Sequence, residues 1–417
     1  MFTSGAKGGF DAVIGNPPYI DSEWLVKTNP SLRDYCNSHY ESATGNWDIF
    51  CIFIEKSLRL CKYLGLSSLI IPNKLLSADY ASGIRDYILN SHTLINIQDY
   101  SSVKVFPVSV YPIIYVAKSG IVSGDDIVKV NEFSQNDENG IFLSSSNQLK
   151  WKKFFTLGNS SWSYIFSSEK HKIIEKVQNQ SVALNSIATI NGAATVAEAY
   201  EWKEFIFDLE DETKEFLMFV NTGTIDRYKY LWGKKKTRYL KNSYLKPVIK
   251  EKHYQYLKEN RLTQATQPKI IAAGMCKFLE CNYDQGGYIA GKSTSIITSE
   301  VIDLLLLLGI LNSKLLSFYY SLSNSGLTLQ GGYFRIGPPQ LKRIPIRISN
   351  NNDSLYTHII SKVKILLELN KQYPKTPHEN ELLQRTISAT DAKIDRLVYD
   401  LYGLTEEEIK IVEDNYQ

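Results

Sequence analysis

The chain has 417 residues, of which 43% are hydrophobic and 12% aromatic, so it is long enough for two or three domains with sizeable cores. The formal net charge of +3 excludes a uniform polycation. The most apolar stretch, Val301 to Leu311, is about half the length of a membrane span, and we expect it to be a buried helix. Five scattered cysteines without paired spacing favour a reducing cytosol and predict no metal site.

An apolar run from Ala12 to Ile14 predicts a buried parallel strand, followed by Asn16-Pro17-Pro18-Tyr19 at its carboxyl end. Ligands bind at this end of the strands in open α/β sheets. The prolines remove two backbone donors, which leaves the Asn16 side-chain oxygen and the Pro17 carbonyl as acceptors beside the Tyr19 ring. Two rigid acceptors can each take one hydrogen of a base amino group and localise its lone pair on a methyl donor. The tyrosine offers a flat face to a base flipped out of a duplex.

The tetrapeptide resembles the catalytic motif of the amino-group DNA methyltransferases of the adenine-specific branch, and its flank from Phe10 to Gly15 also matches. The same tetrapeptide occurs in methyltransferases that modify glutamine in proteins, so the rest of the chain must decide the substrate. The resemblance implies a catalytic role for Asn16, Pro17, Pro18 and Tyr19, with S-adenosylmethionine as the cofactor.

A helix is predicted to open at Asn46 to Phe50, where Asp48 or Asn46 can cap it, and an apolar stripe follows. In the family that the tetrapeptide resembles, the start of this helix lines the donor pocket. By that resemblance Asp48, Phe50 or Phe53 contacts the donor, and the alternative is an ordinary capped core helix. The next predicted elements are a strand at Leu66 to Ile71, a helix at Ala78 to Leu89, and strands at Leu94 to Gln98 and Ile113 to Ala117.

The segment Val105-Phe106-Pro107 lies before the last of these strands. In TaqI-like methyltransferases such an element supplies a second aromatic ring that packs against the flipped adenine. The resemblance therefore implies that Tyr19 and Phe106 sandwich one base. The alternative for Phe106 is a place in the core.

The polar residues 121–150 predict a linker with weak strands, and a new region begins at Trp151. Segments Ile187 to Tyr200 and Asn221 to Tyr228 resemble the target-recognition domain of TaqI-like and related bifunctional restriction-modification enzymes. From Thr224 to Glu280 there are fourteen Lys and Arg against four Asp and Glu, interleaved with tyrosines. This excess favours contact with DNA phosphates over a merely solvated face. The candidate DNA-binding residues are Arg227, Lys229, Lys234, Lys235, Lys236 and Arg238.

Val301 to Tyr320 is predicted to be one helix. Leu341 to Ile346 resembles the close of the recognition domains in these enzymes and also the repeats of restriction specificity subunits. The chain from Ser354 reads as mostly helical. Gly403 is expected to end one helix, and Thr405 with Glu408 to form a capping box for the next.

These patterns predict an α/β fold: a partial Rossmann-like methyltransferase sheet in residues 1–120, a linker in 121–150, an α+β target-recognition domain in 151–346 and C-terminal helices in 347–417. The expected partner is double-stranded DNA, bound by a monomer. No glycine-rich strand-to-helix turn for the donor precedes Asn16, so we expect an N-terminal methyltransferase half on a separate chain or a missing segment. Two functions stay open: an adenine-specific DNA methyltransferase, or a DNA-binding specificity module without activity of its own.

Overall fold

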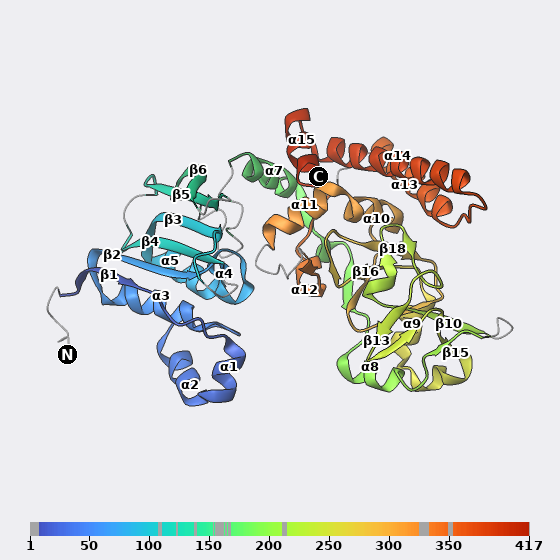
Figure 1. The fold of residues 1–417 in the computed structure, drawn as a ribbon, viewed down its shortest axis with the longest axis horizontal. Helices are drawn as coiled ribbons and strands as arrows, with labels where there is room; N and C mark the ends of the chain where they lie inside the picture. Colours follow the sequence, from blue (N-terminus) through green and yellow to red (C-terminus); the bar gives the residue numbers. More distant parts are fainter. Residues whose placement is uncertain are drawn as a thin grey trace. The chain divides into compact units, whose positions relative to one another are not determined.

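The computed structural model of the protein describes residues 8–106, 111–121, 124–136, 140–152, 154, 162, 165, 168–210, 215–324, 333–348 and 353–416. The chain divides into two compact units, shown in Figure 1. Unit 1 comprises Met1–Lys172 with Leu322–Leu327, and unit 2 comprises Ile173–Ser321 with Thr328–Gln417. The expected succession of an α/β unit, an α+β region and C-terminal helices is confirmed.

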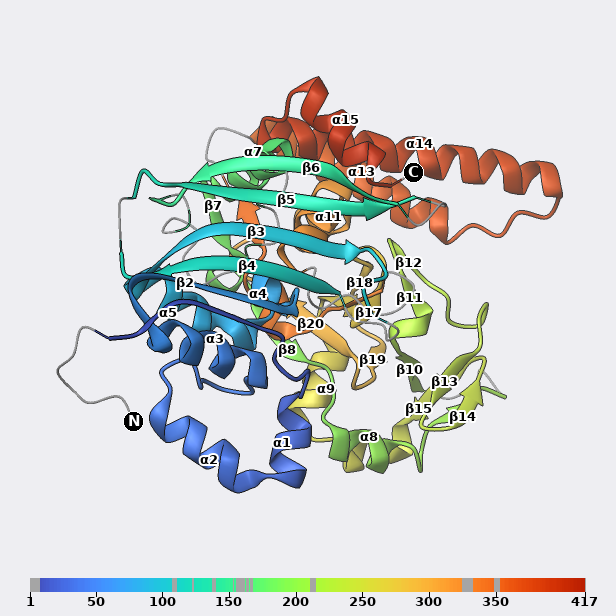
Figure 2. The ribbon, with the colours of Figure 1, turned by 60° about the vertical axis from the view of Figure 1, so that its left-hand side comes forward.

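Unit 1 is built on one mixed sheet with the strand order β1-β2-β4-β3-β5-β6 (Figure 2). Strand β1 runs parallel to β2, and β3 runs parallel to β5, whereas β4 lies antiparallel between β2 and β3. The strands are β1 (Phe10–Gly15), β2 (Cys61–Pro72), β3 (His92–Ser102), β4 (Pro112–Ser119), β5 (Ile127–Gln135) and β6 (Ile141–Lys150).

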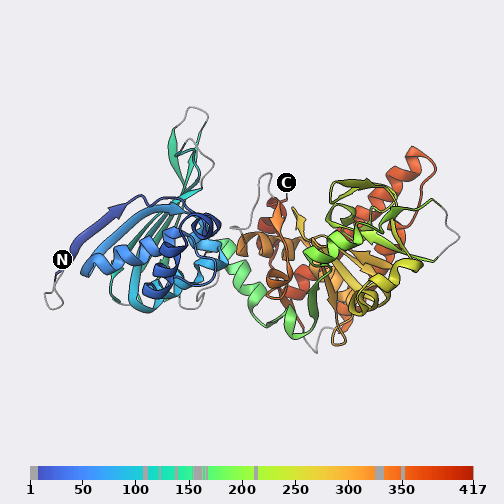
Figure 3. The same cartoon turned by 90° about the horizontal axis from the view of Figure 1, so that it is seen from below.

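Helices α3 and α5 pack on this sheet and supply much of its core (Figures 2 and 3). In α3, apolar residues recur at helical spacing, so Ile54 and Leu58 point inward and are completely buried. The helices of unit 1 are α1 (Ser22–Thr28), α2 (Pro30–His39), α3 (Ile49–Leu60), α4 (Lys74–Ser77) and α5 (Ser82–Ser91). The predicted helices and strands of residues 10–119 are therefore confirmed in type and order.

Two expectations for unit 1 are corrected. Residues 121–150 contain β5 and β6, which extend the sheet beyond β3 instead of forming a linker. Val128 and Val130 of β5 are buried, whereas β6 alternates only exposed and half-buried side chains. Strand β1 is parallel as predicted, but it pairs with β2 alone, and Ile14 is 82% exposed. An edge strand of this kind leaves an apolar side chain uncovered.

Unit 2 contains two four-stranded sheets, ordered β19-β10-β15-β9 and β18-β16-β20-β8, with the hairpins β11-β12 and β13-β14. The first sheet and its hairpins use β9 (Phe207–Asp208), β10 (Phe216–Val220), β11 (Ile225–Asp226), β12 (Lys229–Tyr230), β13 (Thr237–Tyr239), β14 (Asn242–Tyr244), β15 (Pro247–Lys250) and β19 (Tyr288–Ala290). The second uses β8 (Thr189–Gly192), β16 (Lys269–Ala273), β18 (Cys281–Asp284) and β20 (Thr294–Thr298). Two short pairs join β7 (Ser181–Ala183) to β22 (Pro345–Arg347) and β17 (Met275–Cys276) to β21 (Phe334–Arg335).

The remaining α-helices in the described part of the chain are α7 (Ser168–Gln178), α8 (Val196–Trp202), α9 (Glu259–Thr266), α10 (Leu304–Asn312), α11 (Lys314–Ser323), α12 (Pro338–Leu341), α13 (Asp353–Asn370), α14 (Pro377–Tyr402) and α15 (Glu406–Asp414). Helix α10 packs against α13 and α14, so the C-terminal helices belong to the same compact unit as the recognition region. Gly403 ends α14 with φ of 70°, and Thr405 and Glu408 form the predicted capping box.

The single helix predicted for Val301 to Tyr320 is wrong, because the chain breaks at Ser313 and α10 and α11 meet with a bend of 62°. The Asn312 side chain holds the backbone of Cys281 through both its amide and its carbonyl, at 2.9 Å each. Ser313 then accepts a hydrogen bond from Leu316 and caps α11. In the described part of the chain, no single helix has the length and apolar composition of a membrane span; α10 and α11 meet that test only as this bent pair.

Candidate functional site

The Asn-Pro-Pro-Tyr tetrapeptide leaves the sheet at the carboxyl end of β1, where Gly15 lies opposite Leu69 of β2. Pro17 is buried and anchors the segment, whereas Asn16 and Tyr19 are exposed. The Asn16 amide and the Tyr19 ring are thus available to a ligand at the edge of the sheet where α/β folds bind their substrates.

The segment that follows the tetrapeptide is tied to the start of α3. The Ile49 backbone amide donates to the Ile20 carbonyl at 3.2 Å, and the Ser22 amide donates to Asp48 Oδ1 at 3.1 Å. The second carboxylate oxygen of Asp48 accepts from the Tyr80 hydroxyl at 2.5 Å. Asp48 occupies the predicted cap position, but its side chain does not cap α3, because both oxygens are engaged by these other donors. Asp48 therefore acts as a positioning residue for the tetrapeptide.

Burial raises the pKa of Asp48, and the hydrogen bonds from Tyr80 and Ser22 offset this only in part. Burial and the adjacent Asp48 carboxylate also raise the pKa of Tyr80, which keeps its hydroxyl protonated as the donor. Both raised pKa values arise at the same short hydrogen bond between Asp48 and Tyr80, which is partly shielded from solvent.

The two phenylalanines predicted beside Asp48 differ in exposure. Phe50 is buried in the core of unit 1, with its ring centroid 6.3 Å from that of Tyr80. Phe53, one helical turn further along α3, is 41% exposed. Of these two rings, Phe53 has surface to offer a ligand, and Phe50 supports Tyr80 from within.

The two predicted stacking residues meet in the structure. The rings of Tyr19 and Phe106 have their centroids 6.0 Å apart at an interplanar angle of 78°, which is an edge-to-face contact. They come from segments almost ninety residues apart in sequence and yet share one site. A planar base cannot lie between rings in this arrangement, so a sandwich requires one of the rings to turn.

A polar cluster that sequence reasoning did not single out lies at the ends of β2 and β3. Asn73 follows β2 and donates its side-chain amide to Ser101 Oγ at 3.1 Å, and the Ser101 backbone amide donates to Asp99 at 2.7 Å. Burial raises the pKa of Asp99. The asparagine after Pro72 was the one signal for this cluster in the sequence.

The predicted DNA-binding residues of unit 2 fall into two groups. Lys234, Lys235, Lys236 and Arg238 are exposed on β13 and the loop before it. Lys229 pairs with Asp226 at 3.2 Å, and the guanidinium of Arg227 is engaged by Asp391 at 2.9 Å. Arg227 therefore ties the recognition region to α14, and its charge is already compensated.

Two further cations of the basic segment are also held in buried pairs, Arg261 with Glu198 and Lys269 with Asp284. The positive excess between Thr224 and Glu280 that faces solvent is thus smaller than the sequence count. The exposed Lys and Arg side chains of this segment are concentrated between Lys234 and Lys241.

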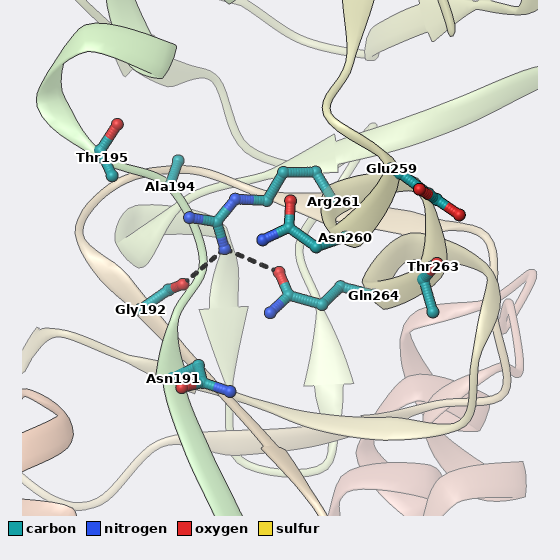
Figure 4. A pocket seen from close by; sticks show the side chains of 9 residues that line it. All are labelled: Asn191, Gly192, Ala194, Thr195, Glu259, Asn260, Arg261, Thr263 and Gln264. Carbon is teal, nitrogen blue, oxygen red and sulfur yellow. Dashed lines mark hydrogen bonds between the residues drawn. The ribbon is translucent and has the colours of Figure 1, made fainter.

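A hollow of about 690 Å³, here called the amide pocket, lies between the ends of β8 and α9 (Figure 4). It is lined by Asn191, Gly192, Ala194, Thr195, Glu259, Asn260, Arg261, Thr263 and Gln264. Arg261 forms its wall. The guanidinium makes two hydrogen bonds to Glu198, at 3.1 and 3.0 Å, and its third nitrogen donates to the Gly192 carbonyl at 2.8 Å and to Gln264 Oε1 at 2.9 Å.

The Arg261 contact fixes which way the Gln264 amide points. A guanidinium has only donors, so the Gln264 oxygen must face it and the amide nitrogen must face the hollow, as Figure 4 shows. Asn191 and Asn260 add two more side-chain amides to the lining. Such a set can make paired hydrogen bonds to a planar polar edge, which is how asparagine and glutamine read bases.

Glu198 is the anchor of this pocket. Burial alone would raise its pKa, but hydrogen bonds from Arg261 and from the Thr195 backbone and side chain lower the pKa to about 2. Glu198 also forms a capping box with Thr195 at the start of α8. That Thr-x-x-Glu pattern was visible in the sequence, whereas its pairing with Arg261, 63 residues later, was not.

The described residues contain no group of three or more His, Cys, Asp and Glu side chains that could hold a metal ion. The five cysteines, including Cys276 and Cys281, are buried and unpaired.

Comparison with known proteins gives two family matches. Residues 1–106 match the family described as Eco57I restriction-modification methylase, and residues 220–346 match the TaqI-like C-terminal specificity domain. The type II methyltransferase M.BstVI of Geobacillus stearothermophilus is 25% identical over 248 residues, covering 54% of this chain and 43% of the relative. The type II methyltransferase M.HincII of Haemophilus influenzae is 30% identical over 176 residues, covering 40% of this chain and 31% of the relative.

The chain thus spans less than half the length of these two curated relatives. Among solved structures, the type IIL restriction-modification enzyme MmeI in complex with DNA aligns over 97% of this chain and 57% of its own, with a TM-score of 0.52 and 12% identity. At that identity the likeness concerns the fold.

The low pKa of Glu198 predicts how the stability of unit 2 depends on pH. A carboxylate with a lowered folded-state pKa stabilises the fold above its ordinary value of 4.5, and that contribution is lost as the pH falls through about 2. We expect Glu198→Gln to destabilise unit 2 near neutral pH and to lose most of its difference from wild type as the pH approaches about 2. Urea unfolding at several pH values, with hydrogen exchange in α8 and α9, measures this.

The matched control is Glu259→Gln, which removes an exposed carboxylate from α9. It should change the unfolding midpoint little at any pH. A Glu198→Gln difference that stays constant across the pH range would show that the carboxylate charge is not what stabilises the pocket.

Proposed function

Because this chain joins an Eco57I restriction-modification methylase segment to a TaqI-like C-terminal specificity domain, we propose that it is a site-specific, adenine-directed DNA methyltransferase that uses S-adenosylmethionine. The observation that carries the proposal is the exposed Asn16 and Tyr19 at the carboxyl end of β1, with Phe106 in contact with the Tyr19 ring. Protein glutamine is a poorer substrate candidate, because it would need no basic recognition region of this size.

In this proposal Asn16 and the Pro17 carbonyl accept the two hydrogens of the adenine amino group. The acceptors are rigid before the substrate arrives, since Pro17 is buried and the following segment is held by Asp48. Preorganised acceptors stabilise the positive charge that develops on the amino nitrogen as it bonds to the methyl carbon. Tyr19 and Phe106 would hold the extruded base by its faces. S-adenosylmethionine, when bound, supplies the methyl group.

The donor would contact α3 at its exposed side, where Phe53 lies, and Asp48 would act indirectly through the tetrapeptide. The uncovered edge of β1, with its exposed Ile14, supports the expectation that further donor-binding strands pair there. Those strands would come from a separate polypeptide or from another part of a longer chain.

Specific DNA binding would reside in unit 2. The exposed cations Lys234, Lys235, Lys236 and Arg238 suit phosphate contacts, which set the position of the duplex without reading its sequence. The amide pocket suits contact with base edges. If the chain is instead a specificity module without activity of its own, these contacts with phosphates and bases would be its entire function.

The first prediction concerns Asn16. Asn16→Ala removes one preorganised acceptor and should lower the rate of methyl transfer by about 10² or more, while specific DNA binding persists. The measurement is transfer of a labelled methyl group from S-adenosylmethionine to DNA by the full-length gene product, alongside a binding isotherm.

Asn90→Ala, an exposed asparagine at the end of α5, is the control and should leave the rate unchanged. If wild type, supplied with the donor-binding strands, binds one DNA sequence specifically but transfers no methyl group, the alternative of a specificity module is correct. If Asn16→Ala keeps more than about a tenth of the rate, the catalytic assignment is wrong.

The second prediction concerns the two rings. A 2-aminopurine at the methylated position should brighten when it leaves the stack and should be partly quenched by Tyr19 and Phe106. The double variant Tyr19→Ala, Phe106→Ala should increase the emission of the bound probe and slow methylation. Tyr63→Ala, an exposed tyrosine of β2, should alter neither signal. Unaltered emission and rate in the double variant would refute the base sandwich.

The third prediction concerns phosphate contacts. Reversing Lys235, Lys236 and Arg238 to Glu should weaken duplex binding and reduce the slope of log K against log salt by about 0.9 for each phosphate that is no longer neutralised. Reversing Lys393 and Lys410, exposed lysines of α14 and α15, should change the slope less. Equal slopes for wild type and the triple variant would mean that the exposed cations are only a solvated face.

A further inference from the structure

Unit 2 has a second large hollow, distinct from the amide pocket and lined by aromatic side chains. It has a volume of about 800 Å³ and is lined by residues of β12, of the turn from β18 to β19, and of α13. We call it the aromatic hollow and define it by six of its lining residues, Tyr230, Trp232, Lys234, Tyr288, Lys364 and Tyr373. Neither the tetrapeptide nor the amide pocket uses any of its residues.

The rings of the aromatic hollow include a fixed pair and an exposed member. Tyr230 and Tyr288 are stacked, with centroids 4.2 Å apart at 30°, and form a rigid wall. Tyr373, just beyond the end of α13, is 77% exposed, and the Lys234 ammonium lies 4.7 Å from its ring centroid. The ammonium is attracted to the ring, and the exposed ring remains accessible to a ligand that could stack on it.

The charges around the hollow select an anionic ligand. Its two acidic side chains are engaged, because Asp284 binds Lys269 and two backbone amides, and Glu368 binds Lys371 at 2.6 Å. Among the described residues, no ion pair is found for Lys234 or Lys364. Aromatic cages that bind cations lack such lysines, so this combination suits a flat ring that carries a phosphate.

A second hollow adjoins the aromatic hollow at Tyr373. A smaller hollow of about 180 Å³ shares Lys229, Lys234, Asn370 and Tyr373 with the aromatic hollow and continues to Leu383 and Gln384 of α14. The Tyr373 ring with its cation thus stands between two adjoining hollows. A single nucleotide would fill one of them, and a strand would pass through both.

We propose that these two hollows form one groove for an unpaired stretch of DNA, with a base stacked on Tyr373 and phosphates bound by Lys234 and Lys364. Stacking on exposed rings between lysines is the general means by which proteins bind single strands without reading their sequence. The proposal does not require that the chain methylates DNA. Of the exposed cations assigned above to duplex phosphates, it shares Lys234 alone, and neither Lys364 nor Tyr373 is among them.

The test is the binding of a fluorescein-labelled oligothymidylate of about twelve nucleotides to the full chain, followed by the anisotropy of the label. Tyr373→Ala and Lys364→Glu should each weaken binding about tenfold, and binding should tighten from thymidine monophosphate to the dinucleotide to the oligomer. Tyr63→Ala and Lys410→Glu, exposed residues outside both hollows, serve as controls and should bind as wild type does.

Binding of the specific duplex is measured on the same variants, which separates this proposal from the proposed function. An unchanged duplex affinity with a weakened single strand supports the groove. Equal affinity for the monophosphate and the oligomer would assign the hollow to a free nucleotide and overturn the strand. A wild-type chain that binds no oligomer, or that binds tetramethylammonium in the hollow instead, would overturn the proposal altogether.

Discussion

The candidate catalytic edge depends on the Asp48 carboxylate, which joins three segments that are separate in sequence. One oxygen holds the backbone just after the tetrapeptide, and the other holds Tyr80, which precedes α5. A half-buried carboxylate is unfavourable unless its oxygens are hydrogen-bonded, and here both are. The loop that carries Asn16 can therefore remain exposed and still have a defined conformation. Proline at positions 17 and 18 adds to this by limiting the backbone of the loop itself.

In unit 2, charge has two separate roles. Arg227, Arg261 and Lys269 are held in pairs with acidic residues and fix the positions of α14, α8 and β18. Breaking a buried pair by removing one partner leaves an uncompensated charge, so these cations are parts of the scaffold. The lysines between β12 and β13 are exposed instead and do not fix the position of another element. The same basic segment thus builds the fold and supplies the free positive charge that a polyanion would meet.

Local patterns predicted most of unit 1, because apolar periodicity and turn residues act within a few positions. The strands that contain Ala12, Leu66 and Ile113 and the helix after Asp48 follow from such patterns. So do the end of α14 at Gly403 and the capping box after it. The tetrapeptide, Tyr19 and Phe106 came from a family resemblance, and the structure adds that the two rings are in contact.

What the sequence could not supply was pairing over long distances. The break at Ser313 depends on the backbone of Cys281 and on Asp395, and the ion pair of Arg227 depends on Asp391, 164 residues later. The hairpin of β5 and β6 shows little apolar alternation, and its place in the sheet comes from pairing with β3. In each case a contact with a residue far along the chain determines the role of a side chain or strand. The residues next to it in the sequence do not indicate that contact.

The division of the chain has a consequence for how its activities can be separated. The tetrapeptide and the ring pair belong to unit 1, whereas the amide pocket and the aromatic hollow belong to unit 2. Each unit has its own core, so substitutions at exposed positions of one should leave the folding of the other intact. Loss of methyl transfer with retained DNA binding, and the reverse, would then report on chemistry and on recognition independently. Under the proposed function, a chain organised in this way could change the sequence that it reads without altering the acceptors that act on the base.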